Sequence, residues 1–364
     1  MLGAPLQVPV VGLGVEEFVM LFVASLAGGA FGAALGALPA FVFTGLVVFL
    51  GEGVAILQRE VASQVDTVSA GELAVGITGV IGFGAVTGPH IAFAGGVAAS
   101  AYAGMKYPEL APDEWPYHFG KNILVAFGTK PDILAVGAVF GVIGMLITQV
   151  ANGVFVNVLG TTPPTDFVAV SVFATAFLAR PVFGYPVVGK PAGAGFLDMS
   201  PFERRERRPQ ADDGPAEHTG RLATEPWLDH QYKWANVTAI GVVGGILGGY
   251  IWIQTGSVFL GYAISTISLL FLTLGVGKIP VTHHITLIGS TGAVVVDPIG
   301  GSVAALLAAG VFGAASGLVG EVAQRLFYAH SGTHVDPPAI AIATMMFVVT
   351  GLHLVGVLPN TGYL

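Results

Sequence analysis

The stretch Val42-Phe43-Thr44-Gly45 has a close copy at Val258-Phe259-Leu260-Gly261, and each copy follows an apolar segment with regularly spaced glycines. Paired glycines precede both copies at the same interval, Gly28-Gly29 in the first and Gly244-Gly245 in the second. One constant offset therefore aligns all of these landmarks. The shared spacing predicts that the chain contains the same structural unit twice.

Further landmarks keep their order along both copies. They are Pro89-His90-Ile91 with His283-His284-Ile285, Val139-Phe140-Gly141 with Val311-Phe312-Gly313, and Gln149 with Glu321. The offset between partners shrinks twice, so the first copy should carry two insertions, roughly at 59–80 and 105–126.

Composition places the chain among membrane proteins. Hydrophobic residues make up 54% of it, charged residues only 10%, and the mean hydropathy is +0.78. Several apolar runs approach or exceed the roughly 20 residues that a helix needs to cross the hydrocarbon core. The first run follows Glu16 and Glu17 and lacks a basic leader, so we expect a transmembrane helix there rather than a cleaved signal peptide. The absence of cysteine excludes disulfides, thiolate metal sites and a cysteine nucleophile.

The predicted fold is all-α, a polytopic transmembrane bundle of about ten helices arranged as two inverted five-helix repeats with broken or short third helices. The first repeat occupies 1–185, a hydrophilic linker 186–235, and the second repeat 236–364. The expected helices are 16–37, 39–58, 82–104, 132–156 and 165–185, then 236–254, 258–276, 281–296, 299–327 and 336–357. Asp132, Thr165-Asp166 and Asp336-Pro337-Pro338 are typical helix starts, where carboxylates cap free amides.

Basic residues indicate the orientation, because short cytoplasmic loops carry an excess of them. The linker 186–235 holds seven of the fourteen lysines and arginines, so we expect it in the cytoplasm and both termini outside a cytoplasmic membrane. An odd number of helices per copy then inverts the second copy. The apolar stretch 72–87 is either a re-entrant segment or a further span, and a full span would change this parity.

Glycine, at 53 residues, recurs every four residues in several predicted helices. The series are Gly28, Gly32 and Gly36; Gly241, Gly245 and Gly249; Gly137 and Gly141; and Gly313 and Gly317. Small-residue faces let helix backbones approach closely in a membrane. These faces should pack within the bundle, and a homo-oligomer formed through them is an open alternative.

The candidate site lies at two histidine segments, where imidazoles stand beside a proline in apolar sequence at equivalent points of the two copies. They are Thr87-Gly88-Pro89-His90 and Pro280-Val281-Thr282-His283-His284. Proline frees carbonyls that need other partners, and histidine can donate, accept or titrate near neutral pH. We expect His90 and His284 to line a pathway with Thr87, Thr282 and Pro89. Successive helical residues diverge by about 100°, so only one of His283 and His284 should face it, and the repeat favours His284. The open alternative is that each histidine only satisfies a kink.

Gln149 and Glu321 are further polar candidates on the long fourth helices. Glu321 can instead neutralise itself with Arg325, four residues later on the same helix face. No paired ligand spacing of the H-E-x-x-H kind occurs, so we expect no metal and no cofactor.

These features favour a channel or secondary transporter for a small solute or ion, whose partners are the lipid bilayer and that solute and include no nucleic acid. A membrane-embedded enzyme is the less favoured alternative, since no clustered acid, base or metal constellation is evident. A structural or scaffold subunit is a third reading, which predicts no solvated cavity. The sequence does not identify the substrate, the coupling ion, the direction of transport or the oligomeric state.

Overall fold

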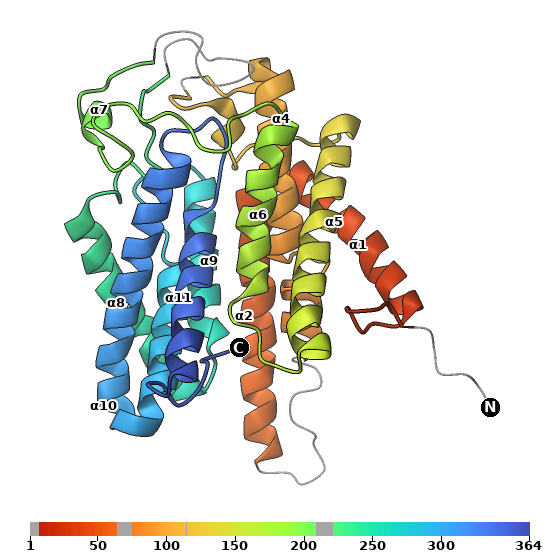
Figure 1. Cartoon of the computed structure of the whole chain (residues 1–364), viewed down its shortest axis with the longest axis vertical. Helices are drawn as coiled ribbons and strands as arrows, with labels where there is room; N and C mark the ends of the chain where they lie inside the picture. Colours follow the sequence, from red (N-terminus) through yellow and green to blue (C-terminus); the bar gives the residue numbers. More distant parts are fainter. Residues whose placement is uncertain (1–6, 64–74, 114, 209–220) are drawn as a thin grey trace.

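The computed structural model describes residues 7–63, 75–113, 115–208 and 221–364, and the fold is all-helical (Figure 1). The α-helices are α1 (Val15–Leu35), α2 (Ala37–Ala62), α4 (Ala94–Lys106), α5 (Pro131–Gly153), α6 (Phe167–Val182), α7 (Ser200–Glu203), α8 (Trp234–Thr255), α9 (Phe259–Thr273), α10 (His283–Ala323) and α11 (Pro337–Leu354). Shorter turns are the π-helices η1 (Val75–Gly82), η2 (Pro89–Phe93), η5 (Val154–Val158) and η6 (Gln324–Tyr328), and the 3₁₀ helices η3 (Pro108–Leu110) and η4 (Phe119–Lys121).

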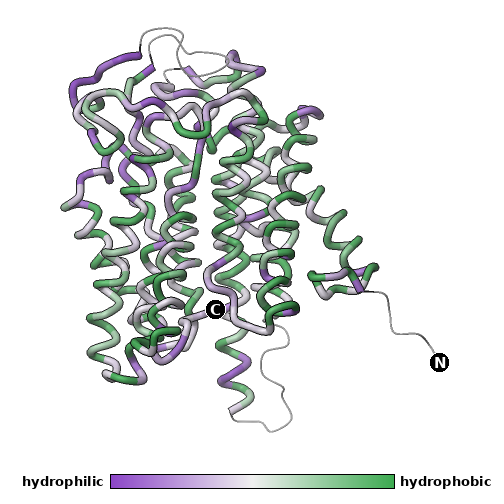
Figure 2. The backbone as a smooth tube through the Cα atoms, in the orientation of Figure 1, coloured by the Kyte–Doolittle hydropathy of each residue, from purple (hydrophilic) through white to green (hydrophobic). Residues whose placement is uncertain are grey.

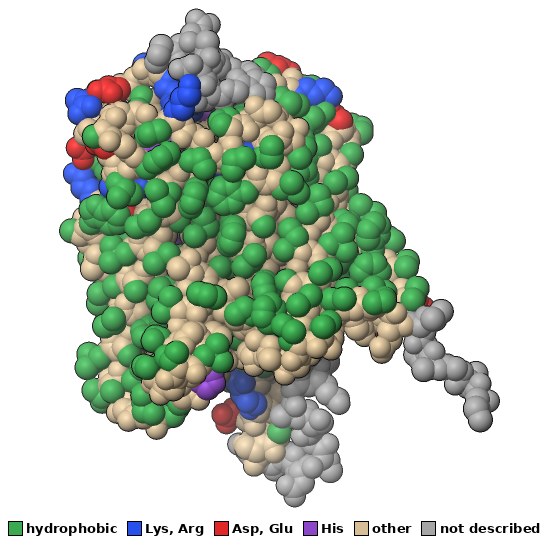
Figure 3. All heavy atoms as spheres, viewed as in Figure 1, with side chains coloured by type: hydrophobic (Ala, Val, Ile, Leu, Met, Phe, Trp, Pro, Cys, Tyr) green, Lys and Arg blue, Asp and Glu red, His purple; other side chains and the backbone are tan. Residues whose placement is uncertain are grey.

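Six helical segments among the described residues are long and apolar enough to cross a membrane. They are Val15–Leu35, Ala37–Ala62, Pro131–Val158, Trp234–Thr255, His283–Tyr328 and Pro337–Leu354. Hydrophobic side chains cover the middle of the surface, while charged side chains gather at its two ends (Figure 3). The backbone shows the same division, with hydrophilic segments concentrated around the linker at one end (Figure 2). A lipid-facing apolar band of this kind identifies a membrane protein.

The expected helix starts at 165–166 and 336–338 are confirmed. Asp166 accepts a hydrogen bond from the amide of Ala169 (3.0 Å), and Asp336 accepts one from the amide of Ala339 (2.9 Å). Each carboxylate thus satisfies an amide that the first helical turn leaves without an intrahelical partner.

The helix expected at 82–104 begins later, at Pro89. Residues 83–88 form turns instead, because Pro89 has no amide to continue a preceding helix and suits a helix start. Within the ambiguous stretch 72–87, η1 lies beside α2, where the Thr78 hydroxyl donates to Oε1 of Glu52 (3.0 Å). Its eight residues are too few to cross a bilayer alone. Residues 72–74 lie outside the described part of the chain.

The two helices expected at 281–296 and 299–327 form the two arms of α10, which are joined by a kink. Gly301 adopts φ +74°, a left-handed conformation that glycine tolerates without the Cβ penalty. The two arms fold back on each other, since the Ser316 hydroxyl donates to the carbonyl of His284 (3.1 Å) and Phe312 packs on Gly292.

Glycines form close contacts between helices, and of those named here Gly137, Gly141, Gly245 and Gly313 belong to the predicted four-residue series. Gly29 of α1 lies against the backbone of Gly137 and Gly141 in α5. In the same way, Gly245 of α8 lies against Ala309 and Gly313 in the second arm of α10. A side chain at either glycine would overlap the facing backbone, so these interfaces require glycine.

The linker lies across one end of the bundle, here called the linker face, together with the loop between α4 and α5 (Figure 1). An isolated bridge between Arg207 and Leu222 ties the two described parts of the linker together. The Arg180 guanidinium, at the end of α6, is fully buried there and donates to Val187, Phe327, Ser331 and Thr333. These bonds fix the segment before α11 to the end of α6.

Candidate functional site

A cavity of about 520 Å³ lies where α2, η2 and α6 meet α9, α10 and α11. Both halves of the chain therefore build its wall. Aromatic side chains dominate the lining, namely Phe41, Phe83, Phe93, Trp115, Tyr117, Trp227, Phe259, Tyr262 and Tyr328. The volume and the largely apolar wall with few polar groups are typical of a small-molecule site.

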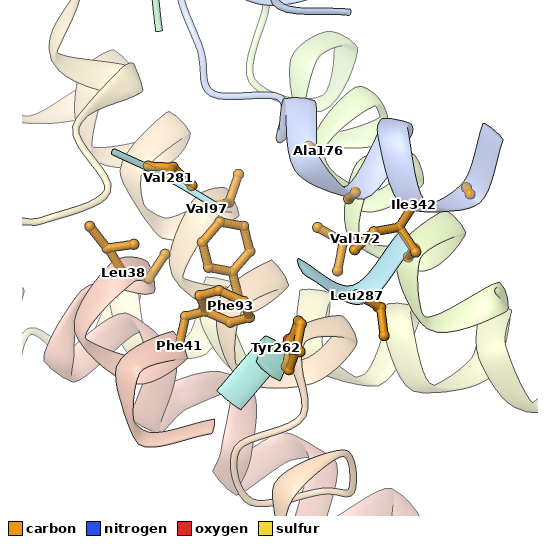
Figure 4. Close-up of a cluster of buried hydrophobic side chains, with 14 of the residues drawn as sticks. Leu38, Phe41, Phe93, Val97, Val172, Ala176, Tyr262, Val281, Leu287 and Ile342 are labelled. Atoms are coloured by element: carbon orange, nitrogen blue, oxygen red, sulfur yellow. The ribbon is translucent and has the colours of Figure 1, made fainter. Parts of the chain in front are cut away.

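Part of the cavity wall is an aromatic cluster around Phe41 of α2, which belongs to the buried hydrophobic core drawn in Figure 4. Its ring packs edge-on against Phe93 (centroids 5.6 Å apart), Tyr262 (6.1 Å) and His283 (4.8 Å). Figure 4 shows Phe41, Phe93 and Tyr262 grouped together, with Leu287 and Ile342 across from them. Residues from four separate helices thus converge at one point.

The structure places His283, and not His284, in the cavity wall. Both residues belong to the first turn of α10, where His283 turns toward Phe41 and Tyr262. His284 turns toward the second arm of α10, where its ring faces Gly320. The two adjacent side chains diverge, as expected from helix geometry. His283, and not the favoured His284, lines this cavity, because the packing of the two arms of α10 sets the rotation of the helix.

His90 is also buried outside the cavity lining, where its backbone carbonyl contacts Gly144 of α5. The Nδ1 atoms of His90, His283 and His284 have no hydrogen-bond partner among the described residues.

The other sequence-predicted site residues do not gather with His283. Pro89 lines the cavity, whereas the Thr87 hydroxyl closes a turn by donating to the carbonyls of Ile81 (2.9 Å) and Gly82 (3.1 Å). Thr282 precedes α10 without a side-chain capping bond and, like Gln149 on α5, is absent from the lining.

Glu321 forms an ion pair with Arg325, which is the alternative that their four-residue spacing allowed. Its Oε1 accepts from Nε of Arg325 (2.6 Å) and from Nε2 of Gln324 (3.0 Å). This buried pair neutralises the carboxylate away from the cavity.

Five acidic or imidazole side chains that the sequence analysis left out of the site line the cavity, namely Asp166, Asp229, His230, His334 and Asp336. Asp166 and Asp336 face it from the first turns of α6 and α11, and His334 faces it from the buried segment that precedes α11. The remaining oxygen of Asp166 accepts from the Tyr363 hydroxyl (2.8 Å), and that of Asp336 lies 3.4 Å from Nε2 of His334. One signal in the sequence was available for the two aspartates, since each stands at the start of the last expected helix of its half.

A buried ionic cluster closes the cavity at the linker face. Nζ of Lys121 lies 2.6 Å from Oε2 of Glu225, whose other oxygen accepts from Arg221 (3.0 Å) and from the amide of His118 (3.2 Å). Lys121 also lies over the Tyr328 ring, 4.5 Å from its centroid. Burial lowers the pKa of Lys121 to about 7, against the opposing effect of the Glu225 carboxylate.

The family model of DUF7973, a family of unknown function, matches residues 10–364. The chain belongs to this family. The match spans both halves and the linker, so the cavity and its acidic side chains all lie within the DUF7973 region. No curated protein and no solved structure matches the chain. Within the described ranges of this DUF7973 protein, no group of three His, Asp or Glu residues could hold a metal ion.

Proposed function

We propose that the protein is a channel or secondary transporter for a small solute or ion, and that its pathway runs through the cavity between two inverted five-helix repeats. The observation that carries the proposal is the cavity itself, which both halves line and which contains buried polar side chains in an otherwise apolar bundle. Polar groups at membrane depth are costly and commonly serve a pathway.

Matched contacts support two equivalent halves. Gly28 and Gly244 each meet an isoleucine side chain, Ile91 and Ile285 respectively. Each half also ends its long fourth helix in a π-helical turn, η5 in the first and η6 in the second, and then starts its last helix with a capping aspartate. Equal contacts at equal positions favour a duplicated unit.

The ends of the helices support the inverted arrangement. α6 ends at the linker face, where Arg180 holds Thr333, while α11 begins just beyond Thr333. Likewise α4 ends at this face near the ionic cluster, and α10 begins near it, where Gln231 of the linker donates to the carbonyl of Val281 (3.2 Å). These ends favour opposite directions for the corresponding helices of the two proposed repeats. We propose that the linker face is cytoplasmic, that both termini lie outside, and that the protein resides in the cytoplasmic membrane.

The same cavity counts against the scaffold alternative, because a subunit packed through glycine faces needs no internal cavity of this size. We retain a homo-oligomer as a proposal for the assembly of the protein. The glycines of the four spaced series are buried within one chain, so other surfaces would form its interface.

Solute flux in proteoliposomes tests the proposal. Purified protein would be assayed for flux and current with a panel of ions, ammonia, urea and small organic ions at pH 5.5 and 8. Val172→Trp, which fills the cavity from α6, should abolish flux, and Val303→Trp, on a 77% exposed position of α10, should leave it unchanged. Absence of flux for every solute with folded protein would reject the proposal.

Histidine variants separate the two assignments of the pathway. His283→Ala tests the residue that lines the cavity, and His90→Ala combined with His284→Ala tests the pair favoured by the repeat. A flux changed by the first alone would locate the pathway in the cavity, whereas a flux changed by the second alone would place it elsewhere in the bundle.

A further inference from the structure

We propose that the cavity recognises a small organic ammonium ion, held by the carboxylates of Asp166 and Asp336 against the aromatic wall. The inference rests on the proposed function, because it names the class of substrate that would use the same cavity. It depends on three features of the wall: carboxylates without a lysine or arginine partner among the described residues, aromatic faces, and imidazole nitrogens without a hydrogen-bond partner there.

The two carboxylates have no basic counterpart. Neither Asp166 nor Asp336 has a lysine or arginine within ion-pair distance among the described residues, and the one imidazole contact is that of His334 with Asp336. The N-termini of α6 and α11 favour the charged form of each aspartate but supply only a partial positive charge. Two carboxylates in an apolar cavity are therefore best compensated by a cation that enters it.

Aromatic rings line the same cavity as these carboxylates. The Tyr262 and Phe93 rings both pack against the Phe41 ring there. Aromatic faces attract organic cations through the ring quadrupole, most strongly where water is excluded. A bare metal ion would use little of a cavity of about 520 Å³, whereas an amine with an apolar body would fill it.

Two histidines add acceptors independently of the carboxylates. His283 and His334 both line the cavity, are at least 95% buried, and have an Nδ1 atom without a hydrogen-bond partner among the described residues. Because Nε2 of His334 faces Asp336, the tautomer that donates to the carboxylate leaves Nδ1 as an acceptor. Acceptors of this kind suit the N–H groups of an ammonium ion.

The positive groups of the wall lie at the linker face. Lys121 is neutralised by Glu225. Lys278 is an exposed lining residue in the loop before α10, and Asp229 of the linker also lines the cavity. Asp336, at the start of α11, also lies toward this face. With Lys121 neutralised, Asp166, Asp229 and Asp336 oppose the exposed Lys278 among the lysines, arginines and carboxylates of the described lining. This distribution favours cations over anions of equal size.

Calorimetric titration of the purified full-length protein with benzylammonium and with benzoate tests the inference. The two probes share a ring and nearly the same size but have opposite charge. Saturable binding of benzylammonium with no binding of benzoate is expected, and equal or tighter binding of benzoate would overturn the inference. This comparison uses the unmodified protein, so it stands even if a variant fails to fold.

Asp166→Asn and Asp336→Asn then test the two carboxylates. Asparagine caps a helix about as well as aspartate, so each variant removes charge while keeping the helix start. Each should weaken benzylammonium binding by about 10- to 100-fold, the range for a lost charged hydrogen bond. Asp198→Asn, in the linker outside the cavity, is the matched control and should not change binding. Unchanged affinity in both cavity variants would overturn the assignment.

Flux measurements keep this inference separate from the proposed function. Transport of another solute without benzylammonium binding would reject the inference and retain the transporter. Benzylammonium binding that depends on both aspartates, without flux of any solute, would retain the cation site and reject transport.

Discussion

In the first half of the molecule Gly32 of α1 lies against Ala92 of η2, and in the second half Gly248 of α8 lies against Thr286 of α10. The two halves thus repeat the same close backbone contact with different sequences around it. They differ in the connection that follows. The loop between α4 and α5 brings Lys121 to Glu225 at the linker face, whereas the two arms of α10 are joined by the kink at Gly301, away from that face.

This comparison separates the scaffold from the site. The repeated glycine contacts hold helices together, because lipid provides no hydrophobic drive between them. The unrepeated ionic cluster gives the linker face a charged group that the repeated contacts lack. Outside the cavity lining, Glu52 of α2 instead accepts from the hydroxyls of Thr78 (3.0 Å) and Ser257 (2.6 Å).

The largest expected effect comes from breaking the shared scaffold. Gly32→Val and Gly248→Val would each force a side chain into the facing backbone, so we expect little or no folded, monodisperse protein from either. Gly53→Val, on α2 with open space around it, should be recovered at the normal yield. Size-exclusion profiles in detergent give the readout, and a folded Gly248→Val protein beside a lost Gly32→Val protein would show that the halves are not packed alike.

Removing one partner of the unrepeated cluster should have the next largest effect. Lys121→Met leaves the Glu225 carboxylate buried with Arg221 as its remaining basic partner, and breaking a buried pair costs about 3–5 kcal/mol. The melting temperature in detergent should fall clearly, and adding Glu225→Gln should restore part of the loss.

The exposed pair Lys106 and Asp132 (2.8 Å) provides the control. Because water screens such a pair, Lys106→Met should change the melting temperature far less than Lys121→Met. Equal losses from the two variants would mean that the cluster at the linker face has no special role in stability.

Hydropathy and glycine spacing predicted the all-helical membrane class and the close contacts, because both are local properties of the chain. The capping aspartates at 166 and 336 were predicted for the same reason. The start of the third helix was misplaced, since the turns at 83–88 depend on where Pro89 can begin a helix.

The composition of the cavity wall could not be predicted in this way. The choice between His283 and His284 depends on the rotation of α10, which is set by contacts with Ser316 and Gly320 far along the chain. Likewise, Lys121 and Glu225 are distant in sequence, and no local pattern pairs them. Side chains join a site through tertiary packing, which periodicity does not encode.

The pH dependence of stability sharpens the contrast at the linker face. The folded pKa of Lys121 is about 7, below the usual value of a free lysine, so the unfolded chain binds this proton more tightly. Stability should therefore rise with pH from about 7 toward the pKa of a free lysine, and be lowest below 7. Melting temperatures between pH 6.5 and 9 give the test, with Lys121→Met expected to flatten the rise. An unchanged slope in that variant would assign the pH dependence to another group.

The smallest expected effect tests whether the two capping aspartates are equivalent. Asp166→Ala and Asp336→Ala each remove a cap from the start of a helix, which typically costs about 1 kcal/mol. The asparagine variants keep the cap and should lie close to the unmodified protein in melting temperature. Similar losses in the two alanine variants would support equal roles for α6 and α11. A loss confined to Asp166 would instead trace its stability to the Tyr363 hydroxyl, a partner whose place is taken by His334 at Asp336.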